Sequence, residues 1–228
     1  MENEAPYIYG IFVEELKNRF LCLVKIDGVE TVCYIPSSCH LGNFLNLVGK
    51  TVLLKPTTTP NARTQYAVYA VKYGKSFITV NLSESNAVVA NSINKRYFSF
   101  LGKRNNVLRE YKIDNYRADI FIQNSKTIVE VKGLLSVEKS AKFPTVYSER
   151  AITQLNKIAE LIVSGYKAVF IIVSHGYGVK NIKINADDTD FYAAFSNCVQ
   201  LGMQYRAYQA KLKNGKLEII KEIPLLFS

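Results

Sequence analysis

The hydrophobic pattern of this 228-residue chain changes after about residue 81. Before that point, short segments alternate apolar and polar residues, which is the period of a half-buried β-strand. The clearest is RFLCLVKIDGVETVCYI, which alternates on both sides of Asp27-Gly28, a dipeptide typical of a hairpin turn. Beyond that point, segments with helical spacing are mixed with apolar strands. The sequence therefore predicts two units of different architecture.

The first unit, residues 1–83, reads as a small β-barrel. Three more short strands are expected in KTVLLKP and in YAVYAVKYGKSFITVNL, which Gly74 divides in two. About five short antiparallel strands in a segment of this length favour a closed barrel, and the OB-fold is a common form. The polar segment TTTPNARTQ is expected to be a loop that carries Arg63. We expect this OB-fold-like barrel to bind DNA.

The second unit, residues 84–228, has the expected order α-β-β-β-α-β-α-β-β, a mixed α/β pattern. SESNAVVANSINKRYFSFLGK predicts a helix with a serine cap that ends at Gly102. Three strands are expected at Val107–Ile113, Ala118–Gln123 and Thr127–Val131. TVYSERAITQLNKIAELIVSGYK has the spacing of an amphipathic helix, AVFIIV that of a buried strand, and DDTDFYAAFSNCVQLG that of a capped helix. A closing hairpin is expected after that.

The charge of the chain favours a polyanionic partner such as nucleic acid. The formal net charge is +10. Residues 1–83 hold 8 basic and 6 acidic side chains, whereas residues 84–228 hold 21 and 13. We therefore expect the second unit to carry most of the contacts with phosphates.

Neither a membrane segment nor a disulfide framework is expected. The first twenty residues carry four glutamates and no basic segment followed by a long apolar one, and the longest apolar run, AVFIIV, has six residues. We expect a cytoplasmic protein with no membrane partner. The four cysteines show no CxxC spacing and are expected to be reduced core thiols. A zinc site of Cys33, Cys39 and His40 is the alternative.

Charged residues interrupt two neighbouring apolar segments in RADIFIQNSKTIVEVKG. Glu130 and Lys132 are expected on one side of a strand, with Val129 and Val131 on the other, and Asp119 on the preceding strand is expected beside Glu130. Two carboxylates, a backbone carbonyl and waters suit a hard ion such as Mg²⁺.

Such a metal site would support phosphodiester cleavage, with Lys132 orienting a water or neutralising charge in the transition state. The alternative is a solvated strand face held by a cross-strand ion pair. The order of helices and strands around the motif is similar to that of the PD-(D/E)xK nuclease core.

Several segments also resemble one known family over nearly the full length of the chain. They are KNRFLCLVKIDG, LVGKTVLLKP, YRADIFI, TIVEVKG and FPTVYSERAITQLNKIAELIVSGYKAVFIIV. The family is that of sugar fermentation stimulation protein A (SfsA). The resemblance implies an N-terminal OB-fold, a C-terminal PD-(D/E)xK domain, DNA binding and, in some members, nuclease activity with Mg²⁺ or Mn²⁺. It also implies a link to the regulation of sugar metabolism.

The resemblance assigns roles to individual residues. It makes Asp119 and Glu130 the metal ligands, Lys132 the catalytic lysine, and Glu149 a residue that supports the site from a helix. The residues expected to contact DNA, from the resemblance or from their place in a loop, are Arg19, Phe20, Arg63, Arg117 and Arg150. PSSCHLG stands where the family has an Asn-Thr-Gly loop, and Gln154 stands where it has a histidine.

Three aromatic residues, Phe20 among them, have two interpretations each. Phe20 and Tyr66 either stack on bases at the barrel surface or belong to the core. His175, after a predicted strand, either faces a site or makes structural hydrogen bonds.

The leading hypothesis is a DNA-binding, metal-dependent endonuclease. The alternative is a noncatalytic DNA-binding transcriptional regulator, and a third is a barrel that binds a small molecule or a protein. The partner is expected to be double- or single-stranded DNA. A monomer and a homodimer are both compatible with these patterns.

Overall fold

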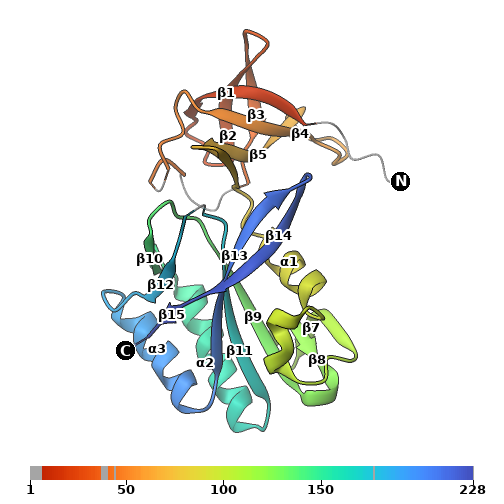
Figure 1. Cartoon of the computed structure of the whole chain (residues 1–228), viewed down its shortest axis with the longest axis vertical. Helices are drawn as coiled ribbons and strands as arrows, with labels where there is room; N and C mark the ends of the chain where they lie inside the picture. Colours follow the sequence, from red (N-terminus) through yellow and green to blue (C-terminus); the bar gives the residue numbers. More distant parts are fainter. Residues whose placement is uncertain (1–6, 37–40, 44, 177, 228) are drawn as a thin grey trace.

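The computed structural model describes residues 7–36, 41–43, 45–176 and 178–227 of the chain. A β-barrel stands on one end of a larger α/β unit, and residues 80–83 join the two (Figure 1). The predicted fold class, a small barrel followed by a mixed α/β unit, is confirmed. The predicted division between residues 83 and 84 lies in the segment that joins the last barrel strand to the first helix.

The barrel is built from a six-stranded sheet. Its strands are β1 (Ile8–Glu15), β2 (Leu21–Ile26), β3 (Val29–Tyr34), β4 (Thr51–Pro56), β5 (Tyr66–Tyr73) and β6 (Ser76–Thr79), and a 3₁₀ turn η1 (Leu41–Asn43) follows β3. They lie in the order β3-β2-β1-β4-β5-β6, and a pairing of Tyr34 with Ala67 brings β3 against β5. Alternate side chains such as Phe12, Val24 and Leu54 fill the interior.

Strand β1 is the part of the barrel that the sequence does not predict. The hairpin expected at Asp27-Gly28 is present, with φ of 49° and 86° at these two residues. In β1, however, the inward-facing position between Ile8 and Phe12 is Gly10. A Cβ atom there would lie 2.4 Å from Cγ1 of Val24. The close packing against β2 thus requires glycine, and the missing side chain hides the alternation of this strand.

The centre of the α/β unit is a second six-stranded sheet in the order β14-β13-β11-β9-β8-β7. Its strands are β7 (Val107–Ile113), β8 (Tyr116–Ile122), β9 (Thr127–Leu134), β11 (Lys167–Ser174), β13 (Gln204–Lys213) and β14 (Lys216–Ile223), with a 3₁₀ turn η3 (Gln123–Ser125) between β8 and β9. The three middle strands run parallel and the outer ones antiparallel. A small parallel sheet of β10 (Ser140–Phe143), β12 (Asn181–Ile184) and β15 (Leu225–Leu226) lies beside it and is not predicted by the sequence.

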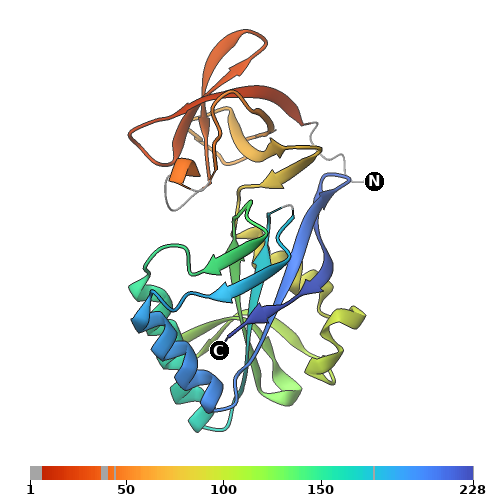
Figure 2. The ribbon, with the colours of Figure 1, turned by 60° about the vertical axis from the view of Figure 1, so that its left-hand side comes forward.

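Helices cover both faces of the central sheet. Helices α2 (Glu149–Val163) and α3 (Thr189–Gln200) pack side by side on one face, and α1 (Glu84–Ser92) with the 3₁₀ helix η2 (Arg96–Leu101) packs on the other (Figure 2). The cap expected on the later helix is present, and α2 has one that is not predicted from the sequence. The side chain of Ser148 accepts from the Ala151 amide, and that of Asp188 accepts from the Phe191 amide.

The single helix predicted from Ser83 to Gly102 is wrong in two respects. It is broken between α1 and η2, because Lys95 adopts an extended conformation with φ −71° and ψ 159°. Ser83 makes no side-chain capping bond, because its own backbone is already helical at φ −66° and ψ −19°. Gly102 does end the segment, with φ 68°.

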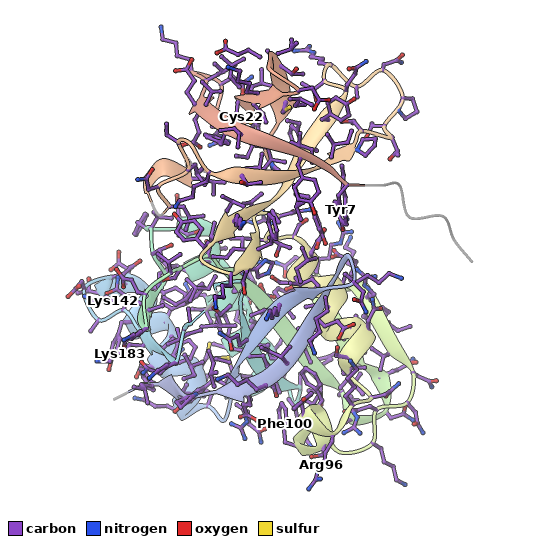
Figure 3. All side chains as sticks on the ribbon, turned by 45° about the horizontal axis from the view of Figure 1, so that its top comes forward. Tyr7, Cys22, Arg96, Phe100, Lys142 and Lys183 are labelled. Carbon is purple, nitrogen blue, oxygen red and sulfur yellow. The ribbon has the colours of Figure 1, made fainter. Side chains whose placement is uncertain are left out.

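The barrel and the α/β unit share a tightly packed junction. Leu135, which follows β9, is buried in the core of the barrel. A Cβ at Gly133 would lie 2.8 Å from Cβ of Leu82 in the joining segment, and the hydroxyl of Thr79, at the end of β6, lies 2.8 Å from Nδ1 of His175, which follows β11. At the other end of the junction, Tyr7 donates a hydrogen bond to the carbonyl of Gly215 in the β13–β14 hairpin (Figure 3). The two units are therefore held in one arrangement.

Candidate functional site

Asp119 lies where strands β8 and β9 separate. The last backbone pair between them is Ile120 with Val129, and beyond it the Val131 amide donates to Oδ2 of Asp119 at 2.8 Å. The Nδ2 of Asn86, on α1, donates to Oδ1 at 2.6 Å. Burial, followed by the nearby charge of Glu130, raises the pKa of Asp119 to about 6. The carboxylate is thus fixed by two donors in a site that disfavours its charge.

Glu130 is buried, with 1% of its surface exposed. Its Oε1 accepts a hydrogen bond from Nζ of Lys132 at 2.5 Å, and its Oε2 accepts one from the hydroxyl of Tyr116. Burial and then the charge of Glu130 raise the pKa of the Tyr116 hydroxyl, which therefore remains a donor. The predicted faces of β9 are as expected, since Val129 and Val131 lie in the core on the side of α1.

Lys132 is held between the strand and a helix. Its ammonium group lies 2.5 Å from Oε1 of Glu130 and 2.6 Å from Oε1 of Gln154, on α2. Its side chain is 22% exposed, so that it borders both the buried carboxylate and solvent. Gln154, which the sequence marks only as a departure from the family pattern, thus positions the lysine.

The cluster fits a hard divalent cation by the chemistry of its donors. Two carboxylates and one ammonium leave one negative charge in excess, and carboxylate oxygens are what Mg²⁺ and Mn²⁺ prefer. Each carboxylate has more acceptor positions than the protein donors use. In the part of the chain that the structure describes, no three His, Cys, Asp or Glu side chains come together as a metal site. Asp119 and Glu130 would therefore hold an ion together with backbone carbonyls, water or substrate oxygens.

The cluster opens into a cleft of about 620 Å³ between the barrel and the α/β unit. Asp119, Lys132 and Gln154 form part of one wall, and the rings of Phe20 and Tyr34 form part of the barrel wall. Residues 80–83, which join the two units, also line it.

The predicted DNA contacts divide into two groups. Phe20 and Arg150 line the cleft, and the guanidinium of Arg19 lies 4.9 Å from the centre of the Phe20 ring. Arg63 and Arg117 are exposed outside the cleft, and Arg117 makes an ion pair of 2.8 Å with Glu110. Glu149 is the exposed first residue of α2 and does not line the cleft, so that its supporting role stays a prediction.

Of the residues with two interpretations, two belong to the core. Tyr66 packs against the interior of the barrel. His175 is buried, and its ring nitrogens make hydrogen bonds of 2.8 Å with the hydroxyls of Thr79 and Ser85. Cys33 is buried, while Cys39 and His40 lie outside the described residues.

Three residues of the site, Tyr116, Asn86 and Tyr34, are not predicted from the sequence. Tyr116 lies three residues before Asp119, and regular alternation along a strand would place these two side chains on opposite faces. In β8, however, the side chains change faces between Ala118 and Ile120, and the sequence pattern does not reveal this change. Asn86 and Tyr34 reach the site only through the packing of distant elements, which leaves no local signal.

Comparison with known proteins gives a consistent result. The family model "Sugar fermentation stimulation protein RE domain" matches residues 83–216, and the "SfsA N-terminal OB domain" matches residues 16–80. Sugar fermentation stimulation protein homologs from Caldanaerobacter subterraneus subsp. tengcongensis and Pelagibacter ubique are 30% and 25% identical to this chain. The alignments cover 89% and 99% of this chain, and 90% and 99% of the relatives.

The fold is also similar to a solved structure. SfsA of Pyrococcus furiosus in complex with Ca²⁺ superposes with a TM-score of 0.80 at 18% identity, covering 97% of this chain and 96% of that one. At this identity the likeness concerns the fold. Among the described residues, no helix is long and apolar enough to span a membrane.

Proposed function

Since the chain belongs to the SfsA family, with an OB domain and a restriction-endonuclease-like domain, we propose that it binds DNA and hydrolyses phosphodiester bonds with Mg²⁺ or Mn²⁺. The observation that carries the proposal is the convergence of Asp119, Glu130 and Lys132 where β8 and β9 separate. A cytoplasmic location remains a prediction from the sequence.

Asp119 and Glu130 would hold the ion. When bound, a divalent ion supplies a Lewis acid for a phosphoryl oxygen and lowers the pKa of a bound water. The protein's own side chains would orient the phosphate and stabilise its charge. The ammonium of Lys132, fixed by Glu130 and Gln154, places a positive charge at the edge of the cleft, where it can stabilise charge that develops on the phosphate. That the SfsA relative from Pyrococcus furiosus was solved with Ca²⁺ supports a divalent metal site in this fold.

Basic side chains near the cleft suit a phosphate backbone. Arg150 lines it. Lys142 and Lys183 are cross-strand neighbours on β10 and β12 outside the residues that line the cleft, and Lys142 makes an ion pair of 2.6 Å with Asp187 (Figure 3). Strand β10 leads directly into Pro144 and Thr145, which also line the cleft. Contacts of this type hold the backbone without reading sequence.

One observation favours a second candidate, a noncatalytic DNA-binding regulator. Both oxygens of Glu130 already accept hydrogen bonds, from Lys132 and from Tyr116. A permanently closed cluster of this kind would be an internal ion pair rather than a metal site.

A cleavage assay separates the two candidates. Plasmid and single-stranded DNA are incubated with Mg²⁺, Mn²⁺ or EDTA and with wild type, Asp119→Ala or Lys132→Ala. A matched control is Asp190→Ala, which removes an exposed carboxylate from α3. We expect metal-dependent cleavage by the wild type and the control alone. DNA binding without cleavage in either metal would instead support the regulator.

A further inference from the structure

The cleft has two walls of different chemistry. On the barrel side, Phe20 and Tyr34 present aromatic rings, and on the α/β side Asp119, Lys132 and Arg150 present charges. Nucleotides have the same two components, a flat base and a charged phosphate. A nucleic acid that contacts both walls must therefore have bases that are not stacked inside a double helix.

The two rings of the barrel wall are arranged for stacking. Their centres lie 6.3 Å apart and their planes differ by 15°. Phe20 is 37% exposed and Tyr34 38% exposed, although large aromatic side chains are usually buried. Arg19 adds a cation at 4.9 Å from the Phe20 ring. Exposed aromatic rings accompanied by arginine are how barrels of this kind bind unpaired bases.

The dimensions and the fixed walls of the cleft favour a single strand. Its volume of about 620 Å³ is in the range that holds a small ligand, and thus one or two nucleotides. The junction through Leu135 and His175 keeps the walls at a set separation. In a duplex, the faces of the bases are covered by their neighbours, so that they cannot reach Phe20 or Tyr34.

We propose that the cleft binds single-stranded nucleic acid, with an unpaired base on Phe20 and Tyr34 and the adjoining phosphate toward Asp119 and Lys132. This inference rests on the proposed function for the part that concerns the phosphate. The position of the base depends only on the aromatic wall. Single-stranded DNA and single-stranded RNA share this chemistry.

Binding is measured by fluorescence anisotropy in EDTA, so that no strand is cut. The probes are labelled single strands of about 15 nucleotides, as DNA and as RNA, and the matching DNA duplex. The variants Phe20→Leu and Tyr34→Leu keep an apolar side chain but remove the ring. Tyr9→Leu is the matched control, since Tyr9 is a 62% exposed ring on β1 outside the cleft.

We expect each cleft variant to weaken single-strand binding by about 5- to 100-fold and to change duplex binding much less. The control should bind like the wild type. Unchanged single-strand affinity in both variants, or an equal loss for the duplex, overturns the inference. A preference for DNA or for RNA identifies the natural strand and supports the inference in either case.

A second measurement keeps an aromatic side chain at position 34 and detects the base directly by fluorescence. The chain contains no tryptophan, so that Tyr34→Trp introduces a single reporter in the cleft. A stacked base should quench its fluorescence, whereas Tyr9→Trp should not respond. Absence of quenching at position 34 when the strand is bound contradicts the inference. Both measurements are made in EDTA, so they remain valid if the protein proves not to cleave DNA. Conversely, if the protein cleaves DNA but Phe20→Leu and Tyr34→Leu bind single strands like the wild type, the inference fails and the proposed function stands.

Discussion

Two clusters of polar side chains lie near the boundary between the barrel and the α/β unit, one fully buried and neutral, the other partly open to solvent and charged. In the first, His175 is bound by the hydroxyls of Thr79 and Ser85, and burial lowers the pKa of the imidazole to about 4, so that it is neutral near pH 7. In the second, Asp119 and Glu130 share a single ammonium group from Lys132. In the neutral cluster both ring nitrogens have a hydrogen-bond partner, whereas the charged cluster has one more carboxylate than ammonium groups.

This difference distinguishes a structural network from a functional one. Buried polar groups stabilise a fold when each has a partner, as at His175. A buried carboxylate beside a half-buried one, as Glu130 beside Asp119, destabilises a fold unless a cation binds to them. The charged cluster is therefore where we expect function, and the neutral cluster is where we expect the orientation of the two units to be maintained.

The largest expected effect is on cleavage, from Glu130→Gln. Glutamine keeps the shape and can still accept from Lys132, but it removes one of two proposed metal ligands. We expect cleavage to fall by about 10³-fold or more, while the free energy of unfolding stays equal or rises, because a buried charge beside Asp119 is removed. Cleavage rates and urea unfolding of the same preparations test this. A large loss of stability would show that the cluster is structural, like that of His175.

The opposite pattern is expected for His175→Ala. The substitution leaves the hydroxyls of Thr79 and Ser85 buried without their partner and opens a cavity, which should lower the free energy of unfolding by about 3 kcal/mol. Urea unfolding near pH 7.5 measures the change. Lys180→Ala, at an exposed position nearby, is the control. A change below about 1 kcal/mol would contradict a structural role for the neutral cluster.

The same histidine predicts how stability depends on pH. Its pKa is about 4 in the folded chain, against an ordinary value of 6.5, so that its contribution is complete above pH 6.5 and is lost as the pH falls toward 4. Between pH 7.5 and 5 this loss amounts to about 2 kcal/mol. The raised pKa of Asp119, about 6, acts in the opposite direction, because its unfavourable contribution is relieved as the pH falls.

The two contributions are separated by substitution. His175→Gln should remove the loss of stability on acidification, and Asp119→Asn should make that loss steeper. Unfolding free energies of the three proteins at several pH values measure this. Parallel pH profiles for wild type and His175→Gln would show that the imidazole does not titrate as the buried position predicts.

A divalent ion should stabilise the charged cluster and leave the neutral one unaffected. At ten times its dissociation constant, a bound ion raises the free energy of unfolding by about 1.4 kcal/mol. We expect Mn²⁺ or Ca²⁺ to raise the melting temperature of the wild type and of His175→Gln, but not that of Asp119→Asn. An equal rise in Asp119→Asn would mean that the ion binds elsewhere.

The sequence predicts the local parts of this site well. The alternation of β9 places Glu130 and Lys132 on one side, and the hairpin with β8 brings Asp119 next to them. The cap of α3, made by Asp188, is likewise a local signal. Each of these features depends on residues a few positions apart, where strand and helix periods are sufficient.

The remaining features depend on contacts between distant segments. β1 is hidden by Gly10, and β10, β12 and β15 have four or two residues each and pair in parallel with segments far away in the chain. The cleft exists only because the junction holds Phe20 and Tyr34 opposite Asp119. No period in the sequence encodes such an arrangement. The sequence therefore predicts that Asp119 and Glu130 lie side by side and that Phe20 can contact a base, but not that Tyr34 lies beside Phe20 or that both rings share a cleft with Asp119.

The smallest expected effect concerns Gln154. In Gln154→Ala, Lys132 loses one of its two anchors but keeps Glu130, so that we expect cleavage to fall by roughly three- to tenfold, about 1 kcal/mol, with little change in stability. Asn156→Ala, an exposed position on the same helix, is the control.

A second variant, Gln154→His, places at this position the residue that the resemblance to the family implies. It should cleave better than Gln154→Ala, because a ring nitrogen of the unprotonated imidazole can accept a hydrogen bond from the Lys132 ammonium. Recovery that disappears as the pH falls below about 6.5 would identify the histidine as the anchor of Lys132, since the protonated ring has no acceptor. Failure to recover at any pH would mean that Gln154 acts through its packing in α2 rather than through its bond to the lysine.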